Sequence, residues 1–354
     1  MEIASLPNTN NIIQKASRIT IDDCLQVRGE DNLVIITDLN TFWMAKALEE
    51  VARSKTDNIL TYVLELHGGE RPLTSLPEEI RQSMDRWATA SIYTARGLEE
   101  ELKSVRYPIL NELVKPRKIR HAHMPGIKYD YLKYINTRPS KINEFGEKLH
   151  NKIEKSKRIH ITTPKIDGID GTDLTGERGS DSRWHNSYGV IEAGIWENIP
   201  SGEVFTYPVK MSGRLVVDGT IGQGFDERFG ILKEKGTPLI LQIEGSRIVP
   251  GSIECENEEL KYRFANYVFN TDYGSSKVGE FGIGTNPGIR KLTGSLLADE
   301  KCMGTAHIAF GNPPQQEKIG KVWWESDAHI DCVMQRVNLY LDDKQIIEDG
   351  NWLI

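Results

Sequence analysis

The sequence predicts an α/β fold in two parts, an N-terminal parallel-sheet α/β domain over residues 1–165 and a C-terminal β-rich α+β domain over residues 166–354. Strand-like and helix-like segments alternate between residues 33 and 163, which is typical of a parallel sheet with helices on its faces. Beyond that region the pattern changes to strands and hairpins. The intervening segment 164–183 is rich in glycine and aspartate, a composition that breaks regular structure, so the domain boundary is expected there.

The N-terminal elements follow from runs of apolar residues. The short run Leu33–Thr37 predicts a strand, and apolar residues at helical spacing predict a helix over 44–52. The alternation continues with a strand over 59–66, a helix after Pro77, a strand over 90–94, a helix over 98–105, a helix over 141–156 and a strand over 158–163. No Gly-x-Gly-x-x-Gly follows the first strand, so we expect this domain to bind neither NAD nor ATP.

The C-terminal elements are mainly strands. We expect strands over 213–219 and 238–243, a tight turn over 244–247, and a helix over 256–269 whose first turns are acidic. A further strand over 328–333 is expected to continue through 337–341 and to turn at Asp342 and Asp343.

Composition excludes several classes of partner. The 354 residues carry 44 Lys and Arg against 51 Asp and Glu, a formal net charge of −7, and basic residues are not interleaved with aromatic ones as on a nucleic-acid-binding surface. No apolar run approaches the length of a membrane span, so no membrane partner is expected. The four cysteines lack Cys-x-x-Cys spacing, and residues 1–11 contain neither a basic leader nor an apolar signal core. These features predict a cytoplasmic protein.

Three side chains in the last quarter of the chain are typical metal ligands. His307 and the pair His329-x-Asp331 supply imidazole nitrogens and a carboxylate, and they follow the glycine-rich segment 279–287. Alternate residues of a strand point to the same face, so His329 and Asp331 should lie side by side. His121 and His123 alternate in the same way, but no acidic residue is close in sequence, so we expect a strand-end or substrate-contacting role for them.

Four stretches around these residues resemble the metal-dependent leucyl aminopeptidases typified by aminopeptidase T. In the order of that family they are 198–208, 279–287, 299–301 together with 304–311, and 329–331. The resemblance implies a two-metal site whose ligands are Glu203, Glu280, His307, His329 and Asp331, with Glu300 as a further match.

The same resemblance implies a function. It implies a hydrolase that removes N-terminal residues from peptides with two divalent ions, zinc, cobalt or manganese, and a metal-activated water. Glu280 is the expected catalytic residue, because a carboxylate next to that water can take and return its proton. A homodimer is also expected.

The chain departs from the family at one position. The family has a tyrosine seven residues after the first histidine, in a His-Ile-Ala-Leu-Gly-Asn-Ala-Tyr stretch, whereas this chain has Pro314 there. Proline cannot donate a hydrogen bond to a developing oxyanion, so the departure predicts weak peptidase activity or a metal-binding relative without it.

A second resemblance, to the 2,5-dihydroxypyridine 5,6-dioxygenases, gives an alternative. It implies a single Fe(II) held by His307, His329 and Asp331, a 2-His-1-carboxylate set that opens a dihydroxylated ring. Those enzymes lack glutamates at the positions of Glu203 and Glu280. The two extra carboxylates favour two metal ions, because neighbouring dications need anionic oxygens between them.

Overall fold

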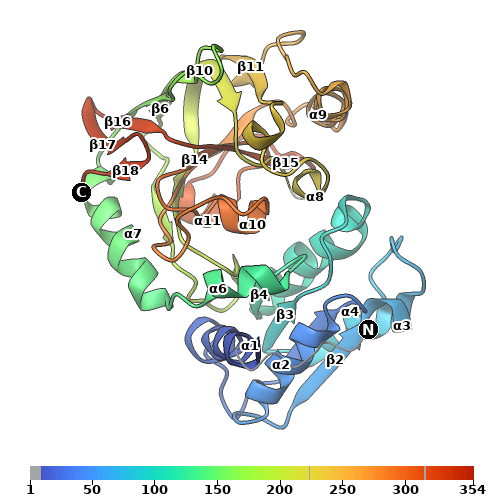
Figure 1. Ribbon diagram of the computed structural model, residues 1–354. Coiled ribbons are helices and arrows are strands. Elements are labelled where there is room, and N and C mark those ends of the chain that lie inside the picture. Colours follow the sequence, from blue (N-terminus) through green and yellow to red (C-terminus); the bar gives the residue numbers. More distant parts are fainter. Residues whose placement is uncertain (1–8, 223, 315) are drawn as a thin grey trace. The chain divides into compact units, whose positions relative to one another are not determined.

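The computed structural model describes residues 9–222, 224–314 and 316–354, and its chain forms two compact units (Figure 1). One unit contains the residues up to Ile142 together with Tyr188–Ser201, and the other contains Asn143–Ser187 and Gly202–Ile354. The chain passes from one compact unit to the other after residues 142, 187 and 201, and not after residue 165. Compact units are not necessarily domains that fold independently, so the domain boundary expected after residue 165 stays a prediction. The expectation about a leader was based on residues 1–11, and residues 1–8 of that segment lie outside the described residues.

A parallel sheet forms the centre of the first unit, as the alternation of strands and helices predicted. Within the described residues its order is β2 (Ile59–Val63), β1 (Leu33–Thr37), β3 (Ala90–Tyr93), β4 (Arg120–His123) and β8 (Trp196–Asn198). Every neighbouring pair is parallel. The expected strand over 59–66 is shorter than predicted, because Leu64–Gly68 turn into a short helix.

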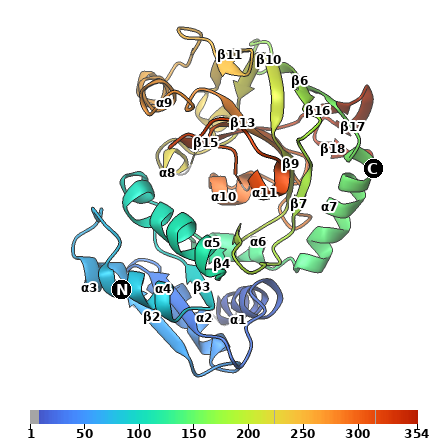
Figure 2. The ribbon, with the colours of Figure 1, turned by 180° about the vertical axis from the view of Figure 1, so that it is seen from behind.

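Both faces of this sheet are buried, which explains why β1 is apolar at its first four positions, 33–36. Leu33 and Ile35 belong to a hydrophobic cluster on one face, and Val34 and Ile36 belong to a second cluster on the other. The first cluster contains residues of α1 (Thr9–Arg18), η1 (Ile19–Cys24), α2 (Phe42–Ala52) and α6 (Leu132–Ile135), and Figure 1 and Figure 2 show α1 beside α2. The second contains residues of α3 (Leu64–Gly68), α4 (Glu78–Arg86), η3 (Leu102–Arg106) and η4 (Pro108–Val114). Short helical turns complete the unit at η2 (Glu99–Glu101), α5 (Lys115–Arg117) and η5 (Tyr129–Tyr131).

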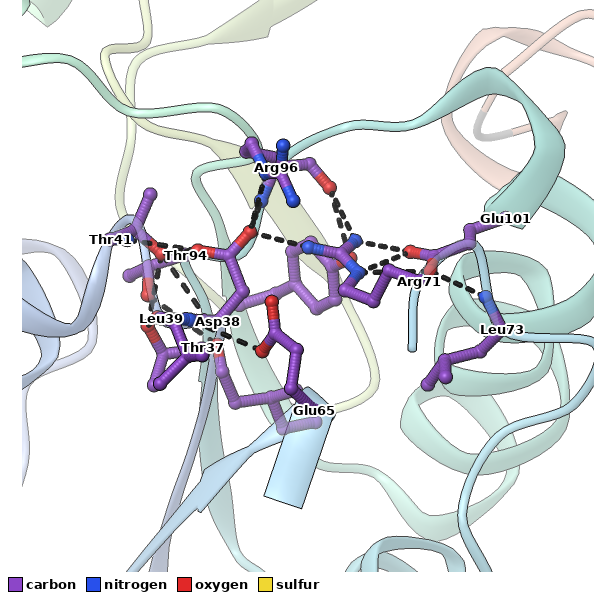
Figure 3. A network of polar contacts seen from close by, with 12 residues as sticks. Thr37, Asp38, Leu39, Thr41, Glu65, Arg71, Leu73, Thr94, Arg96 and Glu101 are labelled. Carbon is purple, nitrogen blue, oxygen red and sulfur yellow. Dashed lines mark hydrogen bonds and ion pairs between the residues drawn. The ribbon is translucent and has the colours of Figure 1, made fainter. Parts of the chain in front are cut away.

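A buried ion network lies where the polypeptide leaves β1 and β3 (Figure 3). Asp38 directly follows β1, and the Arg71 guanidinium pairs with both Asp38 and Glu101, all three side chains being at most 2% exposed. Asp38 also accepts hydrogen bonds from the backbone N–H of Thr41 at 2.8 Å and of Arg96 at 2.9 Å. Burial raises the pKa of Asp38, but these hydrogen bonds and Arg71 outweigh it and lower the pKa below its ordinary value.

Two antiparallel sheets form the second unit. In the described chain the larger one has the order β12 (Arg247–Ile248), β11 (Leu239–Glu244), β10 (Pro208–Val217), β6 (Asp173–Arg178), β5 (Arg158–Thr162), β16 (Asn338–Leu341), β17 (Lys344–Glu348) and β18 (Asn351–Trp352). The smaller one, over described residues only, has the order β15 (His329–Met334), β14 (Ala306–Gly311), β13 (Val278–Gly284), β9 (Glu203–Thr206) and β7 (His185–Ser187). This β-rich part matches the predicted α+β class.

The core of the second unit is one cluster that takes side chains from both sheets. Leu215 and Val217 of the larger sheet pack in it with Phe281 and Ile308 of the smaller one. Helix α9 (Glu258–Asn270) contributes its apolar stripe to the same cluster, and both views place it next to β11 (Figure 1, Figure 2). The other helices are α7 (Pro139–Ile153), α8 (Phe225–Phe229), η6 (Lys233–Lys235), α10 (Leu296–Asp299) and α11 (Gln316–Ile319). For the residues described, none of the helices has the length and apolar character that crossing a membrane requires.

Three expectations about strand order were wrong. The strand expected over 158–163 is β5, and it pairs antiparallel with β6 and β16 instead of joining the parallel sheet. The glycine-rich segment expected to be irregular contains β6, a central strand. The strand expected to run from 328 through 341 ends with β15 at Met334, and β16 lies in the other sheet. The expected turn at Asp342 and Asp343 is present, and both residues have positive φ. Local sequence patterns identified these strands but not their partners.

Candidate metal centre

The smaller sheet places five polar side chains on one of its faces. Residues opposite each other in antiparallel strands point to the same face, and residues two apart along a strand share a face. Glu280 of β13 and Asp331 of β15 both lie opposite Ala309 of β14. His307 lies two residues before Ala309, and His329 lies two residues before Asp331. Glu203 of β9 lies opposite Gly284, four residues after Glu280, and therefore joins the same face.

Small residues between these side chains leave room for them. Gly282 lies opposite His307, and Gly311 lies opposite His329. A Cβ atom at Gly282 would lie 2.1 Å from Nε2 of His307, so only glycine fits beside this imidazole. The other face of the sheet carries Phe281, Ile308 and other side chains of the hydrophobic core, which holds the strands rigid. The polar face is therefore a fixed platform.

Two groups of three donors form on this platform. Glu203, Glu280 and His307 make the first group, with donor atoms within 4.8 Å of one another. Nε2 of His307 lies 3.5 Å from Oε2 of Glu203 and 3.5 Å from Oε1 of Glu280. Glu280, His329 and Asp331 make the second group, in which Nε2 of His329 lies 3.7 Å from Oε2 of Glu280 and 3.5 Å from Oδ2 of Asp331. Glu280 belongs to both groups and faces each with a different oxygen.

Further contacts orient the second histidine. Nδ1 of His329 lies 2.8 Å from the backbone carbonyl oxygen of Asn312, which can accept a hydrogen bond from Nδ1–H and so leaves the lone pair of Nε2 free to bind a metal. The Tyr267 hydroxyl lies 3.2 Å from the backbone N–H of His329. In His307 the Nδ1 atom is buried and no described residue hydrogen-bonds to it. In both rings Nε2 is the nitrogen that faces the carboxylates.

Glu300, the sixth residue implied by the resemblance, belongs to neither group of three. Its Oε1 atom pairs with the ammonium of Lys301 at 2.8 Å, and the same ammonium lies 2.5 Å from Oε1 of Glu203. Lys301 lies in the stretch 299–301 that resembles the aminopeptidase family, but the sequence predicted no role for it. It likewise assigned no role to Gly282 or to the Asn312 carbonyl, because only the register of the sheet shows what these atoms meet.

The pKa values show how strongly these groups act on one another. Burial raises the pKa of Glu280, and the neighbouring Glu203 and Asp331 carboxylates raise it further. Burial lowers the pKa of His307, but the surrounding carboxylates outweigh it and raise the value to about 9. Burial raises the pKa of Asp331, but His329 outweighs it and lowers the value to about 2. Crowded carboxylates thus draw positive charge to the imidazoles, which is the environment that suits a divalent cation.

The donor set fits a divalent metal. It combines two imidazole nitrogens with buried carboxylates, the nitrogen and oxygen ligands that zinc, cobalt, manganese and iron accept. The carboxylates outnumber the cationic groups near them, so bound positive charge would relieve their mutual repulsion. Fold and donor set together define an α/β protein with a candidate metal-binding face on an antiparallel sheet.

Comparison with known proteins narrows this class. The family model of the thermophilic metalloproteases (M29) matches residues 140–331, more than half of the chain, and includes all of the residues proposed as ligands. The chain belongs to this family of metalloproteases, whose members use divalent metals. The resemblance predicted from the sequence is thereby confirmed. No curated protein matches the chain.

Two solved structures share the fold. Wild-type AmpT from Thermus thermophilus has a TM-score of 0.70 and 16% sequence identity, over 97% of this chain and 99% of that one. The 2,5-dihydroxypyridine dioxygenase from Pseudomonas putida KT2440 has a TM-score of 0.67 and 16% identity, over 99% of this chain and 98% of that one. At these identities the likeness establishes the fold and leaves the reaction open. It confirms the predicted α/β fold class.

Proposed function

We propose that this protein is a metal-dependent aminopeptidase that binds two divalent ions, zinc, cobalt or manganese, side by side on the polar face of the smaller sheet. Glu203, Glu280 and His307 would hold one ion, and Glu280, His329 and Asp331 would hold the other. The sharing of Glu280 between two groups of three donors is the observation that carries this proposal. Membership of a metalloprotease family supports it.

Each polar residue of the site would have its own role in the proposed hydrolysis. Bound dications supply electrostatic activation of the peptide carbonyl and of a water molecule. We assign Glu280 the role of the general base, which takes a proton from water and returns it to the leaving amine. The negative charge of this face would attract the α-amino group of an N-terminal residue, which would restrict cleavage to peptide ends. Glu300, held by Lys301, would support Glu203 instead of binding metal directly.

A second candidate is a mononuclear Fe(II) dioxygenase acting on a dihydroxylated ring. The dioxygenase neighbour shares the fold, and His307 and His329 lie 4.0 Å and 3.5 Å from different oxygens of Asp331. Glu203 and Glu280 argue against it. A ring-opening iron centre must keep positions open for substrate and oxygen, and the carboxylate of Glu280 beside it, which no lysine or arginine of the described residues contacts, would add negative charge there.

We also propose a cytoplasmic location and a homodimeric state. All four cysteines are free, and three of them are buried, which suits a reducing compartment. Sedimentation velocity of the full chain tests the dimer, and a single species at the monomer mass would contradict it.

Hydrolysis of leucyl p-nitroanilide in the presence of zinc or cobalt tests the function. We expect slow release of nitroaniline, none from the N-acetylated substrate, and a loss of about 10²- to 10⁴-fold in Glu280→Gln. Asp226→Asn is the matched control, because Asp226 is also a buried carboxylate of the second unit but caps a turn by accepting from the Leu296 N–H. No hydrolysis by the parent, together with oxygen uptake when Fe(II) and a dihydroxypyridine are added, would favour the dioxygenase.

A further inference from the structure

Lys301 is a buried cation of the candidate metal centre that no step of the proposed reaction uses. It follows α10 and one further residue, and its side chain is only 2% exposed. A buried ammonium is stable only when it is paired and hydrogen-bonded. Its partners are Glu203 at 2.5 Å and Glu300 at 2.8 Å.

Lys301 contacts a carboxylate of the first group of donors but none of the second. Glu203 belongs to the first group and gives Oε1 to Lys301, which leaves Oε2 facing His307. Among the described residues no lysine or arginine lies within 4.0 Å of the carboxylate of Glu280 or Asp331. The second group therefore has no cation in direct contact with its carboxylates.

This asymmetry has an electrostatic consequence. A fixed positive charge next to a ligand oxygen repels a dication that approaches the same carboxylate, and low surrounding polarity strengthens the repulsion. Lys301 also partly neutralises Glu203, which lowers the attraction that this carboxylate offers to metal. Both effects are strongest on the first group, because Lys301 contacts Glu203 directly, whereas its charge reaches Asp331 of the second group only without contact.

We propose that Lys301 makes the two metal positions unequal: the position formed by Glu203, Glu280 and His307 binds its ion weakly and exchanges it, while the position formed by Glu280, His329 and Asp331 binds tightly. The inference rests on the proposed pair of metal positions. Lys301 is a positioning residue that acts through Glu203. Its contact holds Glu203 in place when the weak position has lost its ion.

Isothermal titration calorimetry of cobalt binding to chelator-treated protein tests this role without any activity measurement. The parent should bind a tight and a weak equivalent. In Lys301→Met the weak equivalent should gain at least about tenfold in affinity, and the tight equivalent should change much less. The second readout is the melting temperature with and without cobalt, and cobalt should raise it more in Lys301→Met than in the parent, because metal then replaces the lost cation.

Lys277→Met is the matched control. Lys277 is also a buried lysine of the second unit and directly precedes β13, but its ammonium lies 3.5 Å from the ring centroid of Trp323 and no described carboxylate pairs with it. We expect both cobalt affinities of this variant to match the parent. A general effect of losing a buried ammonium would appear in both variants.

The outcomes separate the inference from the proposed function. Two equivalents in the parent with an unchanged or weakened second step in Lys301→Met would overturn the role of Lys301 and leave the two positions intact. One equivalent in both proteins would overturn the two positions and the inference together. One equivalent in the parent and two in Lys301→Met would support the inference in its strongest form. Failure of Lys301→Met to fold even in cobalt-containing medium would overturn it, because metal should then have compensated Glu203.

Discussion

Replacing Gly282 with alanine should weaken metal binding at the position that contains His307 while leaving the fold in place. A Cβ atom at this position would lie 2.1 Å from Nε2 and 2.2 Å from Cε1 of His307, whereas ordinary contacts begin at 3.4 Å. The imidazole would therefore have to withdraw by about 1.3 Å, the difference between 3.4 Å and 2.1 Å. The atoms that clash belong to the side of the ring that faces Glu203 and Glu280.

The size of the effect follows from this displacement. Metal sites tolerate ligand shifts of only about 0.5 Å, so metal affinity at the position containing His307 should fall by about 100-fold or more. Overpacking in a rigid sheet should cost a further ~1 to 3 kcal/mol of folding stability in the metal-free protein. The change is therefore larger for metal binding than for folding.

Two measurements on the same samples check this prediction. Metal content after dialysis against a weak chelator reports the loss of affinity, and urea unfolding of the metal-free protein reports the cost of packing. Gly29→Ala is the control, because a Cβ there meets only one backbone oxygen at 3.6 Å and the residue lies in the other unit. Parent-like metal content in Gly282→Ala would refute the argument that glycine makes room for His307.

Three other predictions concern separate parts of the chain. Arg71→Met leaves the buried Glu101 without its cation and Asp38 with only the partly exposed Arg96, and should lower the free energy of unfolding by ~3 to 5 kcal/mol in urea. Arg81→Met, which breaks an exposed pair, should lower it by ~1 kcal/mol or less. Burial raises the pKa of Asp218 from 3.8 to about 6, so the folded state loses about 3 kcal/mol of stability as the pH rises through that interval. Asp218→Asn should lack this loss, and a parent-like urea midpoint difference between pH 4 and pH 7 would contradict the assignment. Pro314→Tyr restores the donor of the family and should raise turnover of leucyl substrates by about 10²- to 10³-fold, and an unchanged rate constant would show that another group fills that role.

Local signals predicted the elements of the fold but not all their partners. β1 was predicted at its full length, because a strand buried on both faces carries a continuous apolar run, here residues 33–36. β6 was missed, because Gly176 was interpreted as a breaker. In the structure a Cβ at Gly176 would lie 3.0 Å from the Lys210 carbonyl oxygen, so this glycine permits a close approach of two strands. β5 was assigned to the wrong sheet, because a strand that follows a helix carries no information about the strand with which it pairs.

In the candidate site, too, the sequence predicted contacts within one strand but not contacts between strands. Alternation along one strand predicted that His329 and Asp331 share a face, and the structure brings them to 3.5 Å. Glu203 and Glu280 came from resemblance alone, because their meeting depends on the register between β9 and β13, which are far apart in sequence. The role of Lys301 depends on a turn between α10 and β14, whose direction no periodic pattern reveals.

Anomalous X-ray scattering from crystals equilibrated with zinc tests the central claim most directly. The account predicts two zinc peaks per chain, one next to Glu203 and His307 and the other next to His329 and Asp331, with Glu280 in contact with both. In His329→Ala the second peak should be lost. A single peak bound only by His307, His329 and Asp331, with both glutamates turned away from it, would contradict the two-metal centre and support the mononuclear alternative.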